Sequence, residues 1–193
     1  DNVWTNYVRG VMLQLQKKGF KFEGVNCVFS SSIPVGSGLS SSAALECGFL
    51  FGIKELYNLD IKPVDVALMG QSAEHWVGIN CGIMDQFSSV MGLENKVIKI
   101  DCRTLEYEYH DADFNDYSLI LFDSNVKHAL MTSAYNERRE QCEEGIAILK
   151  ANFTEVKSFR DCTEEQVQSV KDKMSEVVFK RSLFVVKEIK RVI

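Results

Sequence analysis

The sequence predicts a mixed chain of helices and short strands that is divided into two lobes. Most segments carry apolar residues at helical spacing, whereas residues 96–101 and 105–109 are typical of the two strands of a hairpin. The polar segment 111–116 is poor in apolar residues and precedes an apolar run, so it is the best candidate for a boundary. We therefore expect one lobe over residues 1–112 and a second over residues 113–193.

The first lobe is expected to connect its helices through glycine-containing loops. An amphipathic pattern predicts a helix over residues 2–18 that is closed by Gly19. Residues 25–31 are rich in β-branched and aromatic side chains and predict a strand. Further helices are expected over residues 40–57, from Pro63 to Trp76 with Gly78 as its end, and from Gly82 to Met91.

The second lobe is expected to begin with a buried strand over residues 117–122 and to continue as helices. One helix is predicted over residues 133–150. Another follows Thr163, which forms a capping-box pair with Gln166. The apolar stripe of this last helix is expected to consist of Val167, Val170, Met174 and Val177.

The composition indicates a compact globular protein without a large cationic surface. Of 193 residues, 46% are hydrophobic and 25% are charged, and the net charge of −5 argues against a broad nucleic-acid-binding face. The six cysteines are scattered without a C-x-x-C pair, so a structural zinc site is not expected. With no signal-peptide pattern and no apolar run of bilayer length, we expect no membrane anchor and a reducing, cytoplasmic location.

The stretch most informative about function is the glycine- and serine-rich run from Pro34 to Ala44. Glycines let a backbone approach a bulky anion, and a helix that starts directly after them presents unpaired N–H groups and a partial positive charge. A hydroxyl there could also bind Mg²⁺, but the run lacks the lysine of a Walker A loop. The alternative is that the three serines only cap the helix and the glycines only turn the chain.

Two carboxylates are further candidates for a functional role. Asp85 follows Gly82 among apolar neighbours, where partial desolvation would suit it to accept a hydroxyl proton. Alternatively, it is a first-turn aspartate that the helix dipole favours. Glu74, at the end of a predicted helix, offers the oxygen ligands that Mg²⁺ prefers. Its alternative interpretation is a solvated surface residue.

These same stretches resemble those of a known enzyme family. Pro34–Ala44 resembles the second conserved motif of the GHMP kinases, and Cys81–Gln86 resembles the signature of the galactokinases within that superfamily. The resemblance implies the two-lobed α+β GHMP kinase fold, with a ribosomal protein S5 domain 2-like N-terminal lobe and a ferredoxin-like C-terminal lobe, both partial here. The likeness continues in family order over nearly the whole chain, through residues 4–10, 73–75, 100–103, 124–128 and 135–143.

The resemblance implies that three residues serve the sugar. Asp85 would lie against the O1 hydroxyl of galactose, as a general base or as an electrostatic orienter of that group. Gly82 and Tyr135 match positions that contact galactose. Tyr135 could otherwise be an ordinary half-exposed helix residue.

The resemblance likewise implies residues for ATP and Mg²⁺. Ser42 and Glu74 would lie near Mg²⁺. Trp4 would pack on the adenine, although it could also be a core residue of the first helix. Lys127 stands where a basic residue near the phosphates is expected, its alternative being an exposed lysine. The residues expected to wrap the phosphates are Gly36, Ser37, Gly38, Leu39, Ser40, Ser41 and Ser42.

The implied function is that of a monomeric galactokinase, which uses ATP and Mg²⁺ to phosphorylate α-D-galactose at O1. A kinase for a related hexose such as N-acetylgalactosamine, and a catalytically silent sensor of galactose and ATP, are the alternatives. The family's first and third motifs are absent, and the chain lacks an initiating Met and ends within an apolar pattern. We therefore expect a fragment whose longer parent carries the activity. Phe184 stands where the family usually has His, a substitution that we interpret as tolerated.

Overall fold

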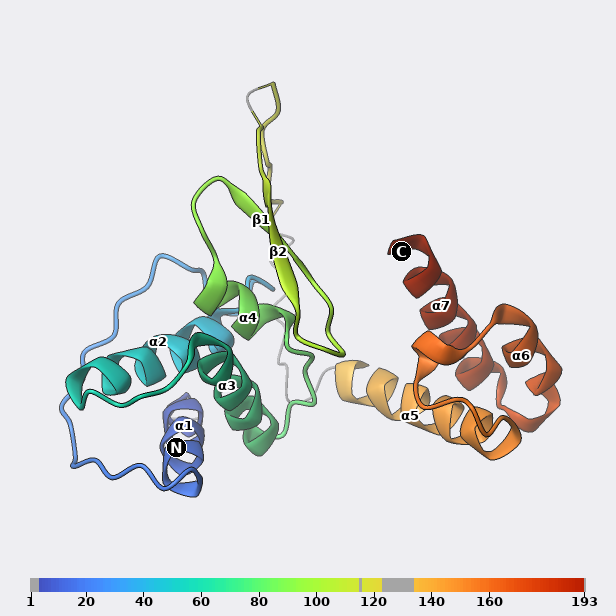
Figure 1. Ribbon diagram of the computed structural model, residues 1–193, viewed down its shortest axis with the longest axis horizontal. Helices are drawn as coiled ribbons and strands as arrows, with labels where there is room; N and C mark the ends of the chain where they lie inside the picture. The colour runs from blue at the N-terminus through green and yellow to red at the C-terminus, as the bar shows by residue number, and fades with distance from the viewer. Residues whose placement is uncertain (1–3, 115, 123–133, 193) are drawn as a thin grey trace. The chain divides into compact units, whose positions relative to one another are not determined.

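The computed structural model describes residues 4–114, 116–122 and 134–192 (Figure 1). The chain separates into two compact units, Asp1–Ala129 and Leu130–Ile193. The boundary between these units, after Ala129, lies further along the chain than the lobe boundary expected after residue 112. The division into family lobes at that residue therefore stays a prediction.

The first unit contains four helices followed by a hairpin within its described residues. Each predicted helix of this region is confirmed to within a few residues. Pro63 occupies the first turn of its helix, and Gly78 closes that helix in the left-handed conformation with φ of 104°. The elements are α1 (Thr5–Lys17), α2 (Ser41–Leu56), α3 (Pro63–Val77), α4 (Met84–Met91), β1 (Lys96–Ile100) and β2 (Tyr107–Asp111).

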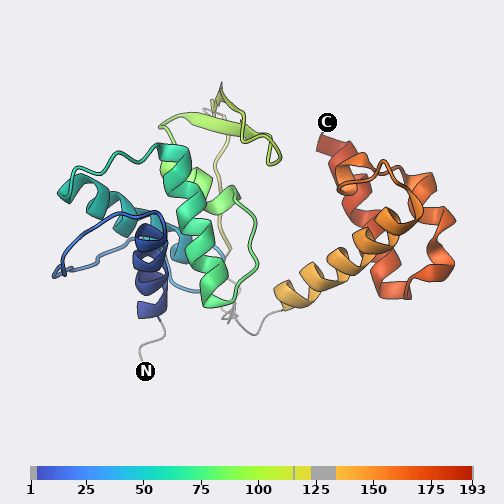
Figure 2. The same ribbon diagram turned by 60° about the horizontal axis from the view of Figure 1, so that its bottom comes forward.

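Helix α3 packs against α1, α2 and α4, and Figures 1 and 2 show it among them. Its contact with α1 depends on a close approach at Gly10. A Cβ at that position would lie 3.0 Å from the backbone oxygen of Ala73. The apolar cluster between these helices comprises Val11, Leu15, Phe49, Leu50, Ile53, Ile61, Val66, Met69 and Ala73.

Replacing Gly10 with alanine is expected to destabilise the protein, because the added methyl group meets backbone that cannot move aside alone. Overpacking of this kind costs about 1–3 kcal/mol, whereas alanine in place of a helical glycine gains about 1 kcal/mol in helix propensity. Because the contact at Gly10 is tight, the cost is expected to exceed the gain. Urea unfolding should therefore show a net decrease in the free energy of unfolding. The matched control is Gly48→Ala on the exposed side of α2, where nothing lies within 4 Å of the added Cβ and a gain in stability is expected. Equal effects of the two substitutions would contradict this account.

The hairpin is confirmed, with the second strand beginning two residues later than expected. The strands are antiparallel and pair Ile98 with Tyr109 and Ile100 with Tyr107. These side chains face α4, where the Tyr107 ring lies edge-on to Phe87 at 5.2 Å and the Tyr109 hydroxyl donates to the Met91 carbonyl at 2.7 Å. Packing against α4 therefore fixes the register of the hairpin.

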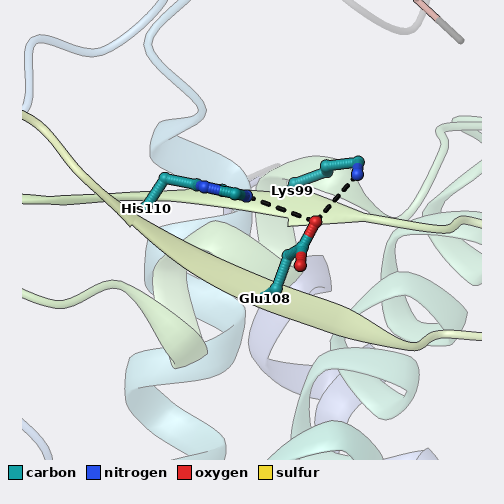
Figure 3. Close-up of polar contacts among 3 residues, drawn as sticks. All are labelled: Lys99, Glu108 and His110. Carbon is teal, nitrogen blue, oxygen red and sulfur yellow. Dashed lines mark hydrogen bonds and ion pairs between the residues drawn. The ribbon is translucent and has the colours of Figure 1, made fainter.

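The opposite face of the hairpin carries charged side chains, which Figure 3 shows. Lys99 Nζ lies 2.8 Å from Glu108 Oε1, and His110 Nε2 lies 3.3 Å from the same oxygen. These contacts lower the pKa of Glu108, with the Lys99 hydrogen bond as the largest cause. All three side chains are exposed, so the pairs contribute little to stability.

The two other predicted strands are wrong. Residues 25–31 and 117–122 form no strand, and β1 with β2 is the only sheet within the described ranges. The burial predicted for residues 117–122 is also wrong, because Phe122 is 92% exposed. A strand needs a neighbouring strand to pair its backbone N–H and C=O groups. The described chain places none beside these segments, so composition alone does not make them strands.

The second unit consists of helices in its described part: α5 (Ala134–Asn152), η2 (Phe159–Asp161), α6 (Glu164–Ser169), η3 (Lys171–Lys173) and α7 (Glu176–Val192). The predicted capping box is confirmed, since the Gln166 N–H donates to Thr163 Oγ1 at 3.2 Å and the Thr163 N–H to Gln166 Oε1 at 2.9 Å. None of the helices described in either unit is long and apolar enough to cross a membrane.

The single helix predicted after Thr163 is wrong. Helix α6 ends at Ser169 with Val170 as its C-cap residue, and α7 begins after Ser175, whose hydroxyl accepts a hydrogen bond from the Val178 N–H. Of the predicted stripe, Val167 and Val170 are buried, but Val177 is half exposed. The break lets both α6 and α5 pack against α7, which one continuous helix would not allow.

Candidate active site

The loop before α2 has the backbone conformation that only glycine adopts readily. Gly36 and Gly38 have φ of +74° and +79°, and nothing lies within 4 Å of a Cβ built at either position. The requirement for glycine is therefore conformational. The Ser37 hydroxyl donates to the Pro34 carbonyl at 2.8 Å, which holds the turn, and Leu39 is exposed beyond it. The loop is thus open to solvent and leads into the start of α2.

The serines at the start of α2 do not behave as ordinary caps. Ser40 is the N-cap residue, in the left-handed region, and its side chain makes no capping hydrogen bond. The first intrahelical bond runs from the Ala44 N–H to the Ser40 carbonyl, so the helix does not use the three preceding amides, Ser41 among them. The Ser42 hydroxyl instead donates to Glu74 Oε1 at 2.7 Å. The capping interpretation is therefore not supported for Ser40 or Ser42.

Glu74 lies in the last turn of α3 and is 4% exposed, so it is not a solvated surface residue. One carboxylate oxygen accepts the hydrogen bond from Ser42, 32 residues away in the sequence. The other accepts from Gln86 Nε2 at 2.5 Å and from the Cys81 thiol at 3.4 Å. The structure thus joins the serine run, the end of α3 and the segment before α4 at one carboxylate.

Gln86 is the residue that completes this arrangement, although the sequence assigns it no role. It is fully buried on α4, and its backbone carbonyl accepts from the Cys47 thiol at 3.9 Å. A Cβ at Gly70 of α3 would lie 2.9 Å from Cys47 Sγ and 3.2 Å from Gln86 Cγ. Glycine at position 70 therefore makes room for Gln86. The available signal was a polar residue next to Asp85 that falls on the buried side of a short helix.

Glu46 is a second residue that sequence reasoning missed. It lies one turn after Ser42 on α2, is fully buried, and neither carboxyl oxygen has a hydrogen-bond partner among the described residues. Burial, reinforced by the charge of Glu74, raises the pKa of Glu46 to about 9, and the Gln86 side chain acts in the opposite direction. The signal for it was a charged residue at helical spacing from Ser42, in the part of α2 before Lys54 that is otherwise without charge.

The two thiols near this cluster are held in their protonated form. Burial is the main cause that raises the pKa of Cys47 to about 12, and burial with the neighbouring Glu74 charge raises the pKa of Cys81 to about 12. Neither thiol is a nucleophile at neutral pH, since reactivity requires the thiolate. The polar chemistry of the cluster therefore rests on its oxygen and amide groups.

Replacing Glu46 with glutamine is expected to change how stability depends on pH. The folded protein keeps the Glu46 proton up to about pH 9, whereas the unfolded chain releases it near pH 4.5. The wild-type free energy of unfolding therefore falls as pH rises between these values, by up to about 1.4 kcal/mol per pH unit. Glu46→Gln lacks this loss, so its free energy of unfolding relative to that of wild type should increase from pH 5 to pH 9.

The measurement is urea unfolding at pH 5, 7 and 9 with EDTA present. The control is Glu94→Gln, which makes the same substitution at an exposed residue in the turn before β1. A Glu46→Gln difference that is the same at all three pH values would show that the carboxyl is already ionised in the folded protein.

Asp85 is the second residue of α4 and is partly buried. Within the described residues, its side chain has no hydrogen bond or ion pair. A first-turn position suits both the functional and the helix-dipole interpretations. Gly82 lies exposed in the loop just before this helix. Asp85 and Gly82 are thus both close in the chain to Gln86, which contacts Glu74.

Three further predicted site residues lie outside the cluster around Glu74 or outside the described residues. Trp4 is 49% exposed at the start of α1 and lies edge-on to Phe29 at 5.9 Å, which excludes the core interpretation. Tyr135 lies in the first turn of α5, half exposed, in the second unit. Its contact with galactose stays a prediction. Lys127 lies outside the described residues, so its position near the phosphates stays a prediction too.

Comparisons with known proteins show what the chain is similar to. Residues 6–93 match the GHMP kinases N terminal domain. The chain is 40% identical over 193 residues to a galactokinase of Thermotoga maritima, covering 100% of this chain and 53% of the relative. It is 38% identical over 168 residues to a galactokinase of Thermosipho africanus, covering 86% of this chain and 46% of the relative.

Solved structures agree with this result. The crystal structure of Lactococcus lactis galactokinase complexed with galactose superposes with a TM-score of 0.87 at 31% identity, over 99% of this chain and 50% of that one. This confirms the predicted mixed α+β fold of a GHMP kinase. The chain spans about half the length of the curated relatives it matches. By these similarities residues 6–93 resemble the GHMP kinases N terminal domain, and the whole chain is similar to galactokinases over about half of their length.

Proposed function

We propose that the full-length protein is a galactokinase, which transfers the γ-phosphoryl group of ATP to O1 of α-D-galactose and releases ADP. The observation that carries the proposal is the meeting of Ser42, Glu74 and Gln86 at the start of α2, directly behind the glycine-serine loop. These residues come from three separate segments that resemble galactokinase motifs. A galactokinase of Thermotoga maritima also matches the whole chain.

The glycine-serine loop is suited to hold the phosphates of ATP. Positive φ at Gly36 and Gly38 turns the loop without side chains in the way, and the unused amides at the start of α2 point outward along the helix axis. Hydroxyl groups of Ser40 and Ser41 add further donors close by. Because phosphoryl transfer depends mainly on positioning and charge stabilisation, such a cradle supplies much of what the reaction needs.

Ser42 and Glu74 fit the binding of Mg²⁺. Their oxygens lie 2.7 Å apart, and a hydroxyl with a buried carboxylate is a hard-oxygen donor set of the kind this ion prefers. Two protein ligands leave the other positions for ATP oxygens and water, as is usual for Mg²⁺. When bound, the ion would neutralise negative charge that develops on the phosphates.

Asp85 is proposed to orient the O1 hydroxyl and to accept its proton as the oxygen bonds to phosphorus. A carboxylate without another partner among the described residues is available for this hydrogen bond. We also propose that Gly82 and Tyr135 contact the sugar, that Trp4 packs on the adenine, and that Lys127 lies near the phosphates. The proposal retains the expectation of a monomeric cytoplasmic enzyme that acts on small molecules.

The test is galactose-dependent ADP release by the full-length protein with Mg²⁺ and ATP. We expect turnover with galactose and only background without sugar. Turnover with N-acetylgalactosamine but not galactose would assign the activity to the related hexose. Binding of galactose and ATP without any turnover would instead support a sensor and remove the proposed role of Asp85.

A further inference from the structure

We propose that Gln86 is a positioning residue that holds the Glu74 carboxylate in its Mg²⁺-binding orientation and couples it to Asp85. This inference rests on the proposed function and extends it to a residue that does not itself touch ATP or sugar. The observation behind it is a buried amide that donates to one oxygen of a buried carboxylate.

The two oxygens of Glu74 are held by different helices. Oε1 accepts from the Ser42 hydroxyl of α2 at 2.7 Å, and Oε2 accepts from Gln86 Nε2 of α4. A cation bound between Ser42 and Glu74 would draw on the first oxygen. Gln86 would then remain the main donor to the second oxygen and the group that keeps the carboxylate from rotating.

The Gln86 side chain is itself confined. It is fully buried, its amide nitrogen lies 3.7 Å from Cys81 Sγ, and it packs beside Gly70 of α3, where an added Cβ would lie 3.2 Å from Gln86 Cγ. Water cannot replace its hydrogen bond at a position from which water is excluded. A confined donor of this kind fixes the geometry of its acceptor more than a solvent-exposed one does.

The coupling to Asp85 follows from adjacency in the first turn of α4. The loop before α4 is tied to α3 by Gln71, whose amide donates to the Cys81 carbonyl at 3.2 Å, and by His75, whose Nε2 lies 2.9 Å from the same oxygen. Gln86 adds the contact that reaches Glu74 itself. Its bond therefore sets the distance between the proposed Mg²⁺ ligand and the proposed base.

The experiment measures Mg²⁺ binding to the full-length protein by titration calorimetry with a non-hydrolysable ATP analogue, which needs no turnover, and the galactose-dependent rate against free Mg²⁺ at saturating ATP and galactose. Gln86→Met keeps the size of the side chain but removes the donor. We expect the half-saturating Mg²⁺ concentration to rise and kcat to fall, each by about tenfold, while the KM for galactose stays within about twofold. Excess Mg²⁺ should restore part of the rate.

The matched control is Gln71→Met, which removes a glutamine amide that bonds the same loop but not Glu74. Its Mg²⁺ dependence should stay within about twofold of wild type. Gln86→Asn, which keeps an amide but draws it back by one methylene, should show the same rise in half-saturating Mg²⁺ and serves if the methionine variant unfolds.

Wild-type Mg²⁺ dependence in a folded Gln86 variant would overturn the inference and leave the proposed function standing. A wild-type protein without galactose-dependent ADP release would instead overturn the proposed function. The Gln86 variants therefore test the inference, and the wild-type protein tests the proposed function.

Discussion

Replacing Asp85 with asparagine in the full-length protein is expected to lower kcat by about 10²–10⁴-fold, the range typical of losing a proton acceptor. Asparagine keeps the shape of the side chain but cannot take the hydroxyl proton. The loss should fall on kcat, with the KM for ATP nearly unchanged, because Asp85 does not belong to the glycine-serine loop that is proposed to hold ATP. Galactose-dependent ADP release measures both constants.

Ser89→Ala provides the control for Asp85, because Ser89 lies on the exposed side of the same helix. It should turn over like wild type. Near-normal turnover of Asp85→Asn would leave Asp85 as a first-turn residue that the helix dipole favours, and the base would have to be sought elsewhere.

Replacing Glu74 with glutamine is expected to lower kcat/KM for MgATP by about 10²-fold or more, since charge stabilisation by a metal ion is worth several kcal/mol. The substitution removes the charge that would bind the ion. In the wild type, the Ser42 hydroxyl and the Gln86 amide both donate to the Glu74 carboxylate. The substitution replaces one of these acceptor oxygens with an NH₂ group, which cannot accept. Activity should remain low even at high Mg²⁺.

The comparison variant for Glu74 is Glu108→Gln on the outer face of the hairpin, where the Lys99 and His110 contacts are exposed (Figure 3). It should keep wild-type kinetics. The prediction fails if Glu74→Gln retains the MgATP dependence of wild type, because the carboxylate would then be only a structural acceptor.

Local signals predicted the helices well. Pro63, Gly78 and the pair of Thr163 with Gln166 act through backbone conformation and contacts within one turn, so a short window of sequence contains their cause. The glycines of the glycine-serine loop belong to the same class, because positive φ is a local property.

Pairing and helix breaks depended on distant partners. Residues 25–31 and 117–122 have the composition of strands, yet in the described chain no neighbouring strand accepts their backbone groups. The apolar stripe expected after Thr163 extends past Ser175 in the sequence. The helix is nevertheless broken before Ser175, because α6 packs against α7.

The sequence by itself determined the helices of the first unit, where the glycine-serine loop lies, and that Ser42, Glu74 and Asp85 are the residues with suitable chemistry. Only the tertiary structure decided that Ser42 and Glu74 are in contact and that Gln86 and Glu46 share their buried surroundings. The physical reason is that helix propensity and capping act within a few residues. Burial and a hydrogen bond between α3 and α4 exist only once the helices have packed together.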